Sequence, residues 1–242
     1  MPNFVTRNTE SELMDDPSVD QAELYEVFGD INRSNRLLGG NRITIHALSQ
    51  LISVFPRKSY TIVDMGCGDG TMLRQVVLWS RGQKFQMKCI GIDLSENALT
   101  IAQANSIDFP EIHYLQQDIL TLNPKDLDCD ILLCTLTMHH FHNRQIPIFL
   151  KQFVELASIG VIINDLQRSP FAYYLFKAFS AIFTRTKIAK HDGLISIQSG
   201  FKKSELIAFS KDLPSMQHQI AWKWAFRYVW VMRTERLTKS YE

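Results

Sequence analysis

The chain has 242 residues, is 45% hydrophobic by composition and carries a formal net charge of +1 at pH 7. This length is enough for one substantial core and a small accessory lobe. Near-neutral charge, with no Lys/Arg block and no basic stripe interleaved with aromatic residues, argues against a nucleic-acid partner. The four cysteines have no Cys-x-x-Cys spacing, so we expect no metal site and no disulfide, and a reducing cytoplasm is the simplest setting.

The N-terminal part shows two predicted helices. Residues 1–18 are polar and expected to be loosely held, and they lack the apolar stretch of a secretory signal. Helical periodicity over 21–32 and 42–55 predicts two helices, which we expect to form a cap or lid within residues 1–56. Residues 57–242 would then form one α/β unit, with 166–205 shaping its ligand pocket.

The strongest motif is the segment 60–71, YTIVDMGCGDGT, in which a buried strand runs into three alternate glycines. The following residues to Trp79 read as a helix, so the glycines lie in a strand-to-helix turn where a ligand can approach the backbone. A dinucleotide loop reads G-x-G-x-x-G, but Thr71 stands where its third glycine belongs. Asp64 would also repel a pyrophosphate, which favours a cationic cofactor without phosphate.

This pattern resembles the first motif of class I S-adenosylmethionine (SAM) methyltransferases; the alternative is a tight glycine turn of any α/β domain. The resemblance implies that the loop wraps the amino-acid and ribose parts of SAM. The loop residues it assigns to the cofactor are Asp64, Gly66, Cys67, Gly68 and Gly70.

Two further strands end in acidic residues. The strand 87–93 ends in Asp93, followed by Leu94, and an acidic residue at this place can accept hydrogen bonds from ribose hydroxyls. The alternative is that Asp93 or Ser95 caps the helix expected from Glu96 to about residue 106. After the strand 112–117, the resemblance implies that Asp118 contacts the adenine amino group and that its neighbour Ile119 packs on the ring.

The remaining strands complete the expected fold. Strands at 130–134 and 159–164 continue the parallel sheet, and the resemblance covers about residues 60–165. Leu94, after the second strand, and Cys134, at the end of the fourth, are further candidate cofactor-binding residues. The tail predicts strands at 216–222 and 226–233, which match the antiparallel hairpin of the methyltransferase fold. We therefore expect a Rossmann-like seven-stranded sheet, its last strand antiparallel, with helices on both faces and an N-terminal helical cap.

Three histidines follow the fourth strand, at positions 139, 140 and 142. A hydroxyl acceptor needs a group that removes its proton, and an imidazole with an ordinary pKa near 6.5 suits that task. His139 or His140 is the candidate base. The alternative is that these histidines cap the next helix, lie on the surface or pack on the cofactor.

The acceptor pocket is expected from the segment after the fifth strand. This segment resembles bacterial small-molecule methyltransferases of polyketide and quinone type, which are expected to carry a histidine where this chain has Gln167. Asp165 could orient a histidine, bind substrate or form a turn. The candidate acceptor-binding residues are Asn164, Asp165, Arg168, Tyr173, Tyr174 and His191, with Phe171 and Phe179 as further apolar wall.

The aromatic stretch 170–184 allows three interpretations: a core helix, a pocket wall or a patch that touches lipid. With Lys177 inside, it is too short to span a bilayer, so no stable membrane insertion is expected.

The favoured function is phenolic O-methylation of an apolar, aromatic small molecule by a cytoplasmic, SAM-dependent monomer or homodimer. The alternatives are C-methylation of a quinol precursor, a catalytically silent SAM-binding module and an NAD-dependent oxidoreductase.

Overall fold

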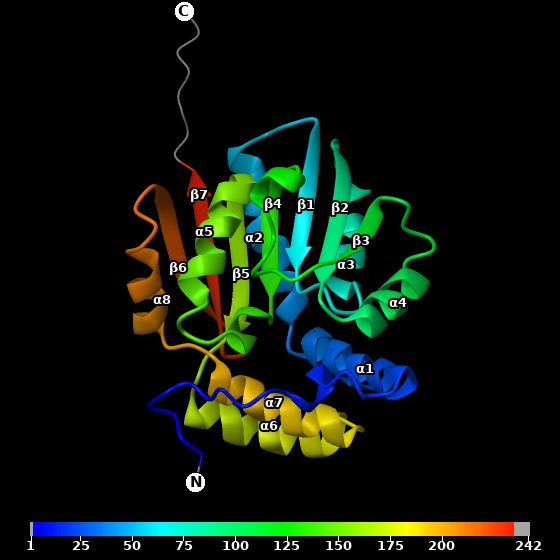
Figure 1. The fold of residues 1–242 in the computed structure, drawn as a ribbon, viewed down its shortest axis with the longest axis vertical. Coiled ribbons are helices and arrows are strands. Elements are labelled where there is room, and N and C mark those ends of the chain that lie inside the picture. The colour runs from blue at the N-terminus through cyan, green and yellow to red at the C-terminus, as the bar shows by residue number, and fades with distance from the viewer. Residues whose placement is uncertain (1, 235–242) are drawn as a thin grey trace, which may run out of the picture.

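The computed structural model describes residues 2–234, which form a seven-stranded sheet with helices on both faces (Figure 1). The spatial order is β3-β2-β1-β4-β5-β7-β6. Neighbouring strands pair in parallel from β3 to β5, whereas β7 is antiparallel to both β5 and β6. The strands are β1 (Ser59–Met65), β2 (Gln86–Asp93), β3 (Ile112–Gln116), β4 (Cys129–Thr135), β5 (Ala157–Leu166), β6 (Met216–Lys223) and β7 (Arg227–Thr234).

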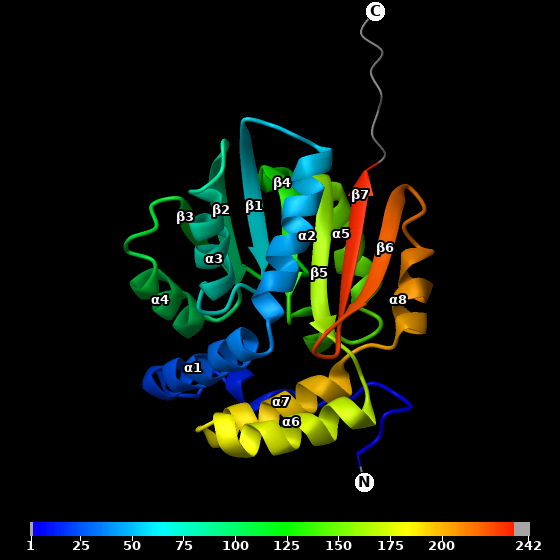
Figure 2. The same ribbon diagram turned by 180° about the vertical axis from the view of Figure 1, so that it is seen from behind.

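Helices cover the two faces of this sheet. α2 (Gly40–Val54) and α3 (Thr71–Ser80) lie on the face seen in Figure 2, and their apolar residues share one core cluster with β1, β4 and β5. α5 (Ile146–Leu156) and α8 (Lys203–Ser210) lie on the face seen in Figure 1 and contribute to a second cluster. α4 (Glu96–Asn105) packs beside β2 and β3 and against α1. Because both faces are covered, the central parallel strands are almost entirely apolar.

A further layer lies across the carboxyl ends of the parallel strands (Figures 1 and 2). It consists of α1 (Gln21–Leu37), α6 (Pro170–Phe183), α7 (Lys187–Ser199) and the short 3₁₀ turn η1 (Leu13–Asp15). Two other 3₁₀ turns are η2 (Pro124–Asp126) and η3 (Met138–His140). None of the helices within residues 2–234 is long and apolar enough to cross a membrane.

The N-terminal part differs from its expected arrangement in two respects. α1 lies over the strand ends, but α2 packs on the sheet because Leu48, Leu51 and Ile52 belong to the core. The segment before α1 is held in place. Arg7 donates hydrogen bonds to the carbonyls of Ser199 and His139, so this polar stretch is fixed by contacts with residues far along the chain.

Candidate active site

A cavity of about 1140 Å³ lies between the carboxyl ends of the parallel strands and the layer of α1, α6 and α7. Single-ligand pockets are commonly about 300–1,000 Å³, so this cavity has room for a cofactor and an acceptor together. Open parallel sheets bind ligands at this edge because the loops after the strands meet there.

The glycine loop after β1 forms one wall of the cavity. Gly66, Gly68 and Gly70 have φ of 71°, 52° and 77°, in the left-handed region that disfavours other residues. A Cβ on Gly66 would lie 2.3 Å from Cγ2 of Thr137. Gly70 does not line the cavity: its missing Cβ leaves room for the Tyr114 hydroxyl, which such an atom would meet at 2.0 Å.

Asp64, at the end of β1, is the most unusual charged group of this wall. It is buried, and its Oδ1 has no hydrogen-bond partner among the described residues. Burial raises the pKa of this carboxyl well above its usual value, and the nearby Asp93 carboxylate raises it further. A cationic ligand with N–H donors would supply both the missing charge and the missing hydrogen bond, so the site fits the ammonium group of an amino-acid cofactor.

Asp93 faces the same cavity from the end of β2. Its Oδ2 accepts the Gly68 N–H at 2.8 Å and its Oδ1 accepts the Ser95 N–H at 3.0 Å. Ser95 caps α4 by accepting the Ala98 N–H at 3.2 Å, so the cap does not occupy Asp93. The other predicted cofactor residues that line the cavity are Gly66, Cys67, Gly68, Leu94, Asp118 and Ile119.

Cys134 lies outside the cavity, contrary to the prediction. Its side chain points into the core cluster that β4 shares with α5, and burial raises the pKa of its thiol far above the usual value. Successive side chains of a strand point to opposite faces of the sheet. The sequence alone does not show whether the side chain of a residue near the end of β4 meets the core or the cavity.

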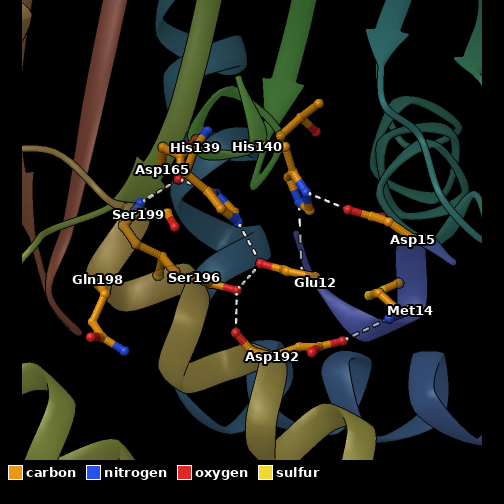
Figure 3. Close-up of polar contacts among 12 residues, drawn as sticks. Glu12, Met14, Asp15, His139, His140, Asp165, Asp192, Ser196, Gln198 and Ser199 are labelled. Carbon is orange, nitrogen blue, oxygen red and sulfur yellow. Dashed lines mark hydrogen bonds and ion pairs between the residues drawn. The ribbon is translucent and has the colours of Figure 1, made fainter. Parts of the chain in front are cut away.

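Two histidines after β4 meet carboxylates from two other segments, the N-terminal segment and the end of β5 (Figure 3). His139 Nδ1 lies 2.7 Å from Asp165 Oδ1, and its Nε2 lies 3.3 Å from Glu12 Oε1. His140 Nδ1 lies 2.9 Å from Asp15 Oδ2, and its Nε2 lies 3.9 Å from Glu12 Oε2. We refer to Glu12, Asp15, His139, His140 and Asp165 as the histidine cluster. All of its members except Asp165 line the cavity.

The charges of the histidine cluster follow from its geometry. Burial alone would lower the pKa of His139, but the carboxylates of Asp165 and Glu12 outweigh it and raise that pKa to about 10. His139 is therefore a cation at neutral pH, and both its ring nitrogens are engaged. Burial and the His139 charge lower the pKa of His140, yet Asp15 and Glu12 raise it above its ordinary value. The His139 cation in turn keeps the pKa of Asp165 low against the opposing effect of burial.

Three members of this cluster have the residue types of a metal site. Glu12, His139 and His140 each offer one ligand atom, and these atoms lie within 4.8 Å of one another. They could hold a divalent cation, although hydrogen bonds among the same atoms also account for their convergence.

The sequence missed Glu12 and Asp15, because nothing in a polar N-terminal segment marks one acidic residue as a partner of a histidine more than 120 positions away. Glu12 is only 7% exposed, and it also accepts a hydrogen bond from the Ser196 hydroxyl of α7. Asp192 of α7 accepts the N–H groups of Leu13 and Met14 at 2.9 Å and so fixes η1. The contacts of Glu12 and Asp15 arise from tertiary packing and leave no pattern in the local sequence.

Most predicted acceptor residues do not reach the cavity. Asn164 is buried and donates to the Gly40 carbonyl and to Thr44 Oγ1. Arg168 pairs with Glu205 and donates to the Gly200 carbonyl. Their polar groups are thus used to join α2 and α8 to the end of β5.

The other predicted acceptor-binding residues also lie outside the cavity lining. Tyr173 packs edge-on against Phe4, and Tyr174 and Phe171 point outward from α6. His191 is a half-exposed neighbour of Asp192 on α7. Asp165 orients His139, which is one of the roles expected for it. The inner face of α6 lines the cavity with Ala172, Leu175, Phe176 and Phe179, of which Phe179 alone was predicted.

Comparisons with known proteins agree with this geometry. Residues 62–160 match a family model described as a methyltransferase domain. No curated protein matches the sequence. Among solved structures, the plantazolicin methyltransferase BpumL in complex with SAH is 17% identical, with a TM-score of 0.68, over 92% of this chain and 94% of that one.

A second similar structure is the magnesium protoporphyrin IX methyltransferase ChlM from Synechocystis PCC 6803 with bound SAH. It is 14% identical, with a TM-score of 0.56, over 81% of this chain and 84% of that one. At these identities the likeness concerns the fold.

Proposed function

We propose that the chain, whose residues 62–160 match a methyltransferase domain, is a SAM-dependent methyltransferase that methylates an ionisable hydroxyl, most simply a phenol, on an apolar aromatic small molecule. The observation that carries this proposal is His140. It lies in the wall of a largely apolar cavity and is held by Asp15 through Nδ1, and its Nε2 lies 3.9 Å from Glu12 Oε2, beyond hydrogen-bond distance.

The cofactor side of the proposal rests on the acidic residues at the strand ends. SAM supplies an electrophilic methyl group on a sulfonium. We assign the cofactor's ammonium group to Asp64, its ribose to Asp93 and its adenine to Asp118 and Ile119. The backbone of Gly66, Cys67 and Gly68 and the side chain of Leu94 complete the binding surface. Asp64 supports this assignment, because its buried and unpartnered oxygen requires a donor.

His140 is the proposed base, and His139 is not. His139 holds its proton to a pKa of about 10 and is bonded on both nitrogens, so it has no free lone pair at neutral pH. In neutral His140 the Asp15 carboxylate favours the proton on Nδ1, which leaves the Nε2 lone pair to take a hydroxyl proton. His139 is a positioning residue: its cation fixes Glu12, which in turn faces His140.

The acceptor class follows from the opposite wall. Leu24, Phe28, Phe176, Phe179 and Ile197 give the cavity a broad apolar surface, which suits an aromatic or alkyl body better than a polar one. A phenol has an ordinary pKa of about 10, so transfer of the sulfonium methyl group to its oxygen gains from an oriented base that takes the hydroxyl proton.

The test is radiolabelled methyl transfer to a panel of phenols and quinols by the wild-type chain and by His140→Gln. We expect His140→Gln to lower kcat about 100-fold or more, the usual size of a general-base effect, with SAH affinity little changed. The wild-type rate should rise with pH through the raised pKa of His140, because only the neutral imidazole accepts a proton.

His142→Gln is the matched control, since His142 lies two residues away and takes no part in the histidine cluster; its rate should equal that of the wild type. A His140→Gln enzyme as fast as wild type would refute the base. Product analysis by mass spectrometry and NMR distinguishes O-methylation from ring C-methylation. SAM binding with no turnover of any acceptor would favour a silent binding module.

A further inference from the structure

The outer face of α6 is unusually apolar for a surface. Lys177 is the helix's only charged residue, and Phe171, Tyr174 and Ile182 are exposed at helical spacing on the side away from the cavity, with the exposed Leu175 at the edge between the two sides. Ile182 is 76% exposed. A helix face with this many apolar residues is normally buried against the protein core. Its exposure here therefore points to an interaction surface.

Aromatic residues of the β6–β7 turn continue this face. The Phe171 ring packs against Phe226 at 5.6 Å between centroids, and Phe226 packs against Trp224 at 5.3 Å. Trp222 and Trp224 are both exposed. The two segments lie side by side at the lower end of the molecule in Figure 2. We call this continuous surface the apolar ridge; it consists of Phe171, Tyr174, Leu175, Ile182, Phe183, Trp222 and Trp224.

The segment that carries the ridge has an excess of positive charge. Four Lys or Arg residues and one acidic residue occur from position 170 to 200, and the acidic one, Asp192, is buried. The whole chain carries a net charge of +1, so the rest of it is net acidic. Lys177, Arg185, Lys187 and Lys223 are exposed on the ridge or within a few positions of its members.

The ridge also adjoins the cavity. Leu175 and Trp224 are exposed on the ridge and line the cavity with their other surfaces. α6 is therefore the boundary between the surface and the proposed acceptor site: Phe176 and Phe179 face inward while Ile182 faces outward. An apolar molecule bound against the ridge would have a short apolar path into the cavity.

From these observations we propose that the apolar ridge docks on an anionic lipid surface and that the acceptor is a membrane-partitioned amphiphile taken up beside it. The second part rests on the proposed function. Trp and Tyr prefer the boundary between headgroups and acyl chains, and Lys and Arg are attracted to anionic headgroups. At 14 residues, α6 would lie in the plane of that boundary. A second copy is the less favourable occupant, because a twofold interface would bring like charges together.

The test is sedimentation of the full chain with phosphatidylcholine vesicles, with and without phosphatidylglycerol. We expect binding to the anionic vesicles that weakens about tenfold or more with zwitterionic ones and with rising salt. The double substitution Phe171→Ser and Ile182→Ser should weaken anionic-vesicle binding about tenfold or more, because two large apolar side chains no longer enter the bilayer. Lys177→Glu with Lys187→Glu should remove the preference for anionic lipid.

Leu78→Ser is the control: Leu78 is an exposed apolar residue on α3, on the sheet face and away from the ridge. Vesicle binding that Leu78→Ser weakens as much as the ridge substitutions would overturn the proposal, as would the absence of binding. Self-association that the ridge substitutions abolish, measured by sedimentation equilibrium, would also overturn it and make the ridge a contact between copies.

Methyl transfer to a short, water-soluble phenol without vesicles is measured on the same variants. The ridge substitutions should leave it within about twofold of wild type while lowering transfer to a long-chain phenol embedded in vesicles. Vesicle docking without phenol methylation would support the lipid-docking proposal and refute the proposed function. Phenol methylation without vesicle docking would support the proposed function and refute lipid docking.

Discussion

Asp64 lowers the stability of the ligand-free protein and favours the binding of a cationic ligand. Its carboxyl is buried and lacks a partner for Oδ1, and burial and Asp93 together raise its pKa. Because the folded pKa lies above the unfolded value, ionising Asp64 weakens the fold as pH rises. A cationic ligand reverses this effect by favouring the carboxylate, so ligand binding and proton release should be linked.

We therefore predict opposite effects of Asp64→Asn on stability and on binding. At pH 7 the free energy of unfolding of the ligand-free protein should rise by about 1 kcal/mol, because the unfavourable burial of a charge is removed. SAH affinity should fall about 10- to 100-fold. Urea unfolding and calorimetry measure the two quantities, and calorimetry in buffers of different ionisation enthalpy should show that the proton released by wild type is absent in the variant. A destabilised variant with unchanged affinity would contradict this interpretation.

At the scale of elements, the N-terminal segment completes the site. It brings Glu12 and Asp15 to the histidines, and its position depends on Asp192, whose two carboxylate oxygens accept the N–H groups that begin η1. Arg7 supports the same path by lying over the Phe201 ring at 4.3 Å. The segment therefore behaves as a strap, meaning residues 3–18, tied at both ends to the layer above the strand ends.

We predict that Asp192→Ala loosens this strap and impairs transfer by displacing Glu12 and Asp15 from the histidines. Two N–H groups lose their partner, so hydrogen exchange of residues 8–18 should become faster, and kcat should fall about tenfold through misplaced Asp15. SAH affinity should stay within about threefold of wild type. Asp212→Ala, an exposed acidic residue after α8, is the control. Unchanged exchange in the strap with a lowered kcat would show that Asp192 acts in another way.

The sequence predicted the parts of the molecule that have local signals. The five parallel strands, the hairpin from 216 and the Ser95 cap follow from apolar runs, glycines and capping residues that lie next to each other in the chain. The wall residues of the cofactor cavity could be found for the same reason. The contacts of Glu12 could not be predicted, because they join segments far apart in the chain. The positions of Tyr173, against Phe4, and of Tyr174, on the outer side of α6, could not be predicted either, because they depend on which side of α6 meets α7.

At the scale of the whole molecule, the histidine cluster joins the N-terminal strap, the loop after β4, the end of β5 and, through Ser196, α7. Its ion pairs should therefore make the global stability depend on pH. The folded pKa of His139, about 10, lies above its ordinary 6.5, so its contribution is fully present below pH 6.5 and is lost as pH rises toward 10. Glu12 and Asp165 have lowered pKa values, so their contribution is present at neutral pH and is lost in acid.

We predict that the free energy of unfolding falls by up to about 4 kcal/mol from pH 6.5 to about pH 9.5, since each pH unit between the two pKa values of one group is worth about 1.4 kcal/mol. Urea unfolding at both pH values measures this change in the wild type and in His139→Gln. The variant should be less stable at pH 6.5, because Asp165 and Glu12 then lie buried without their cation, and its stability should fall much less over the same interval. His218→Gln, a histidine on β6 outside the cluster, should keep the wild-type slope. An equal slope in His139→Gln would mean that the cluster does not hold His139 as a cation, and the choice of His140 as the base would then lose its reason.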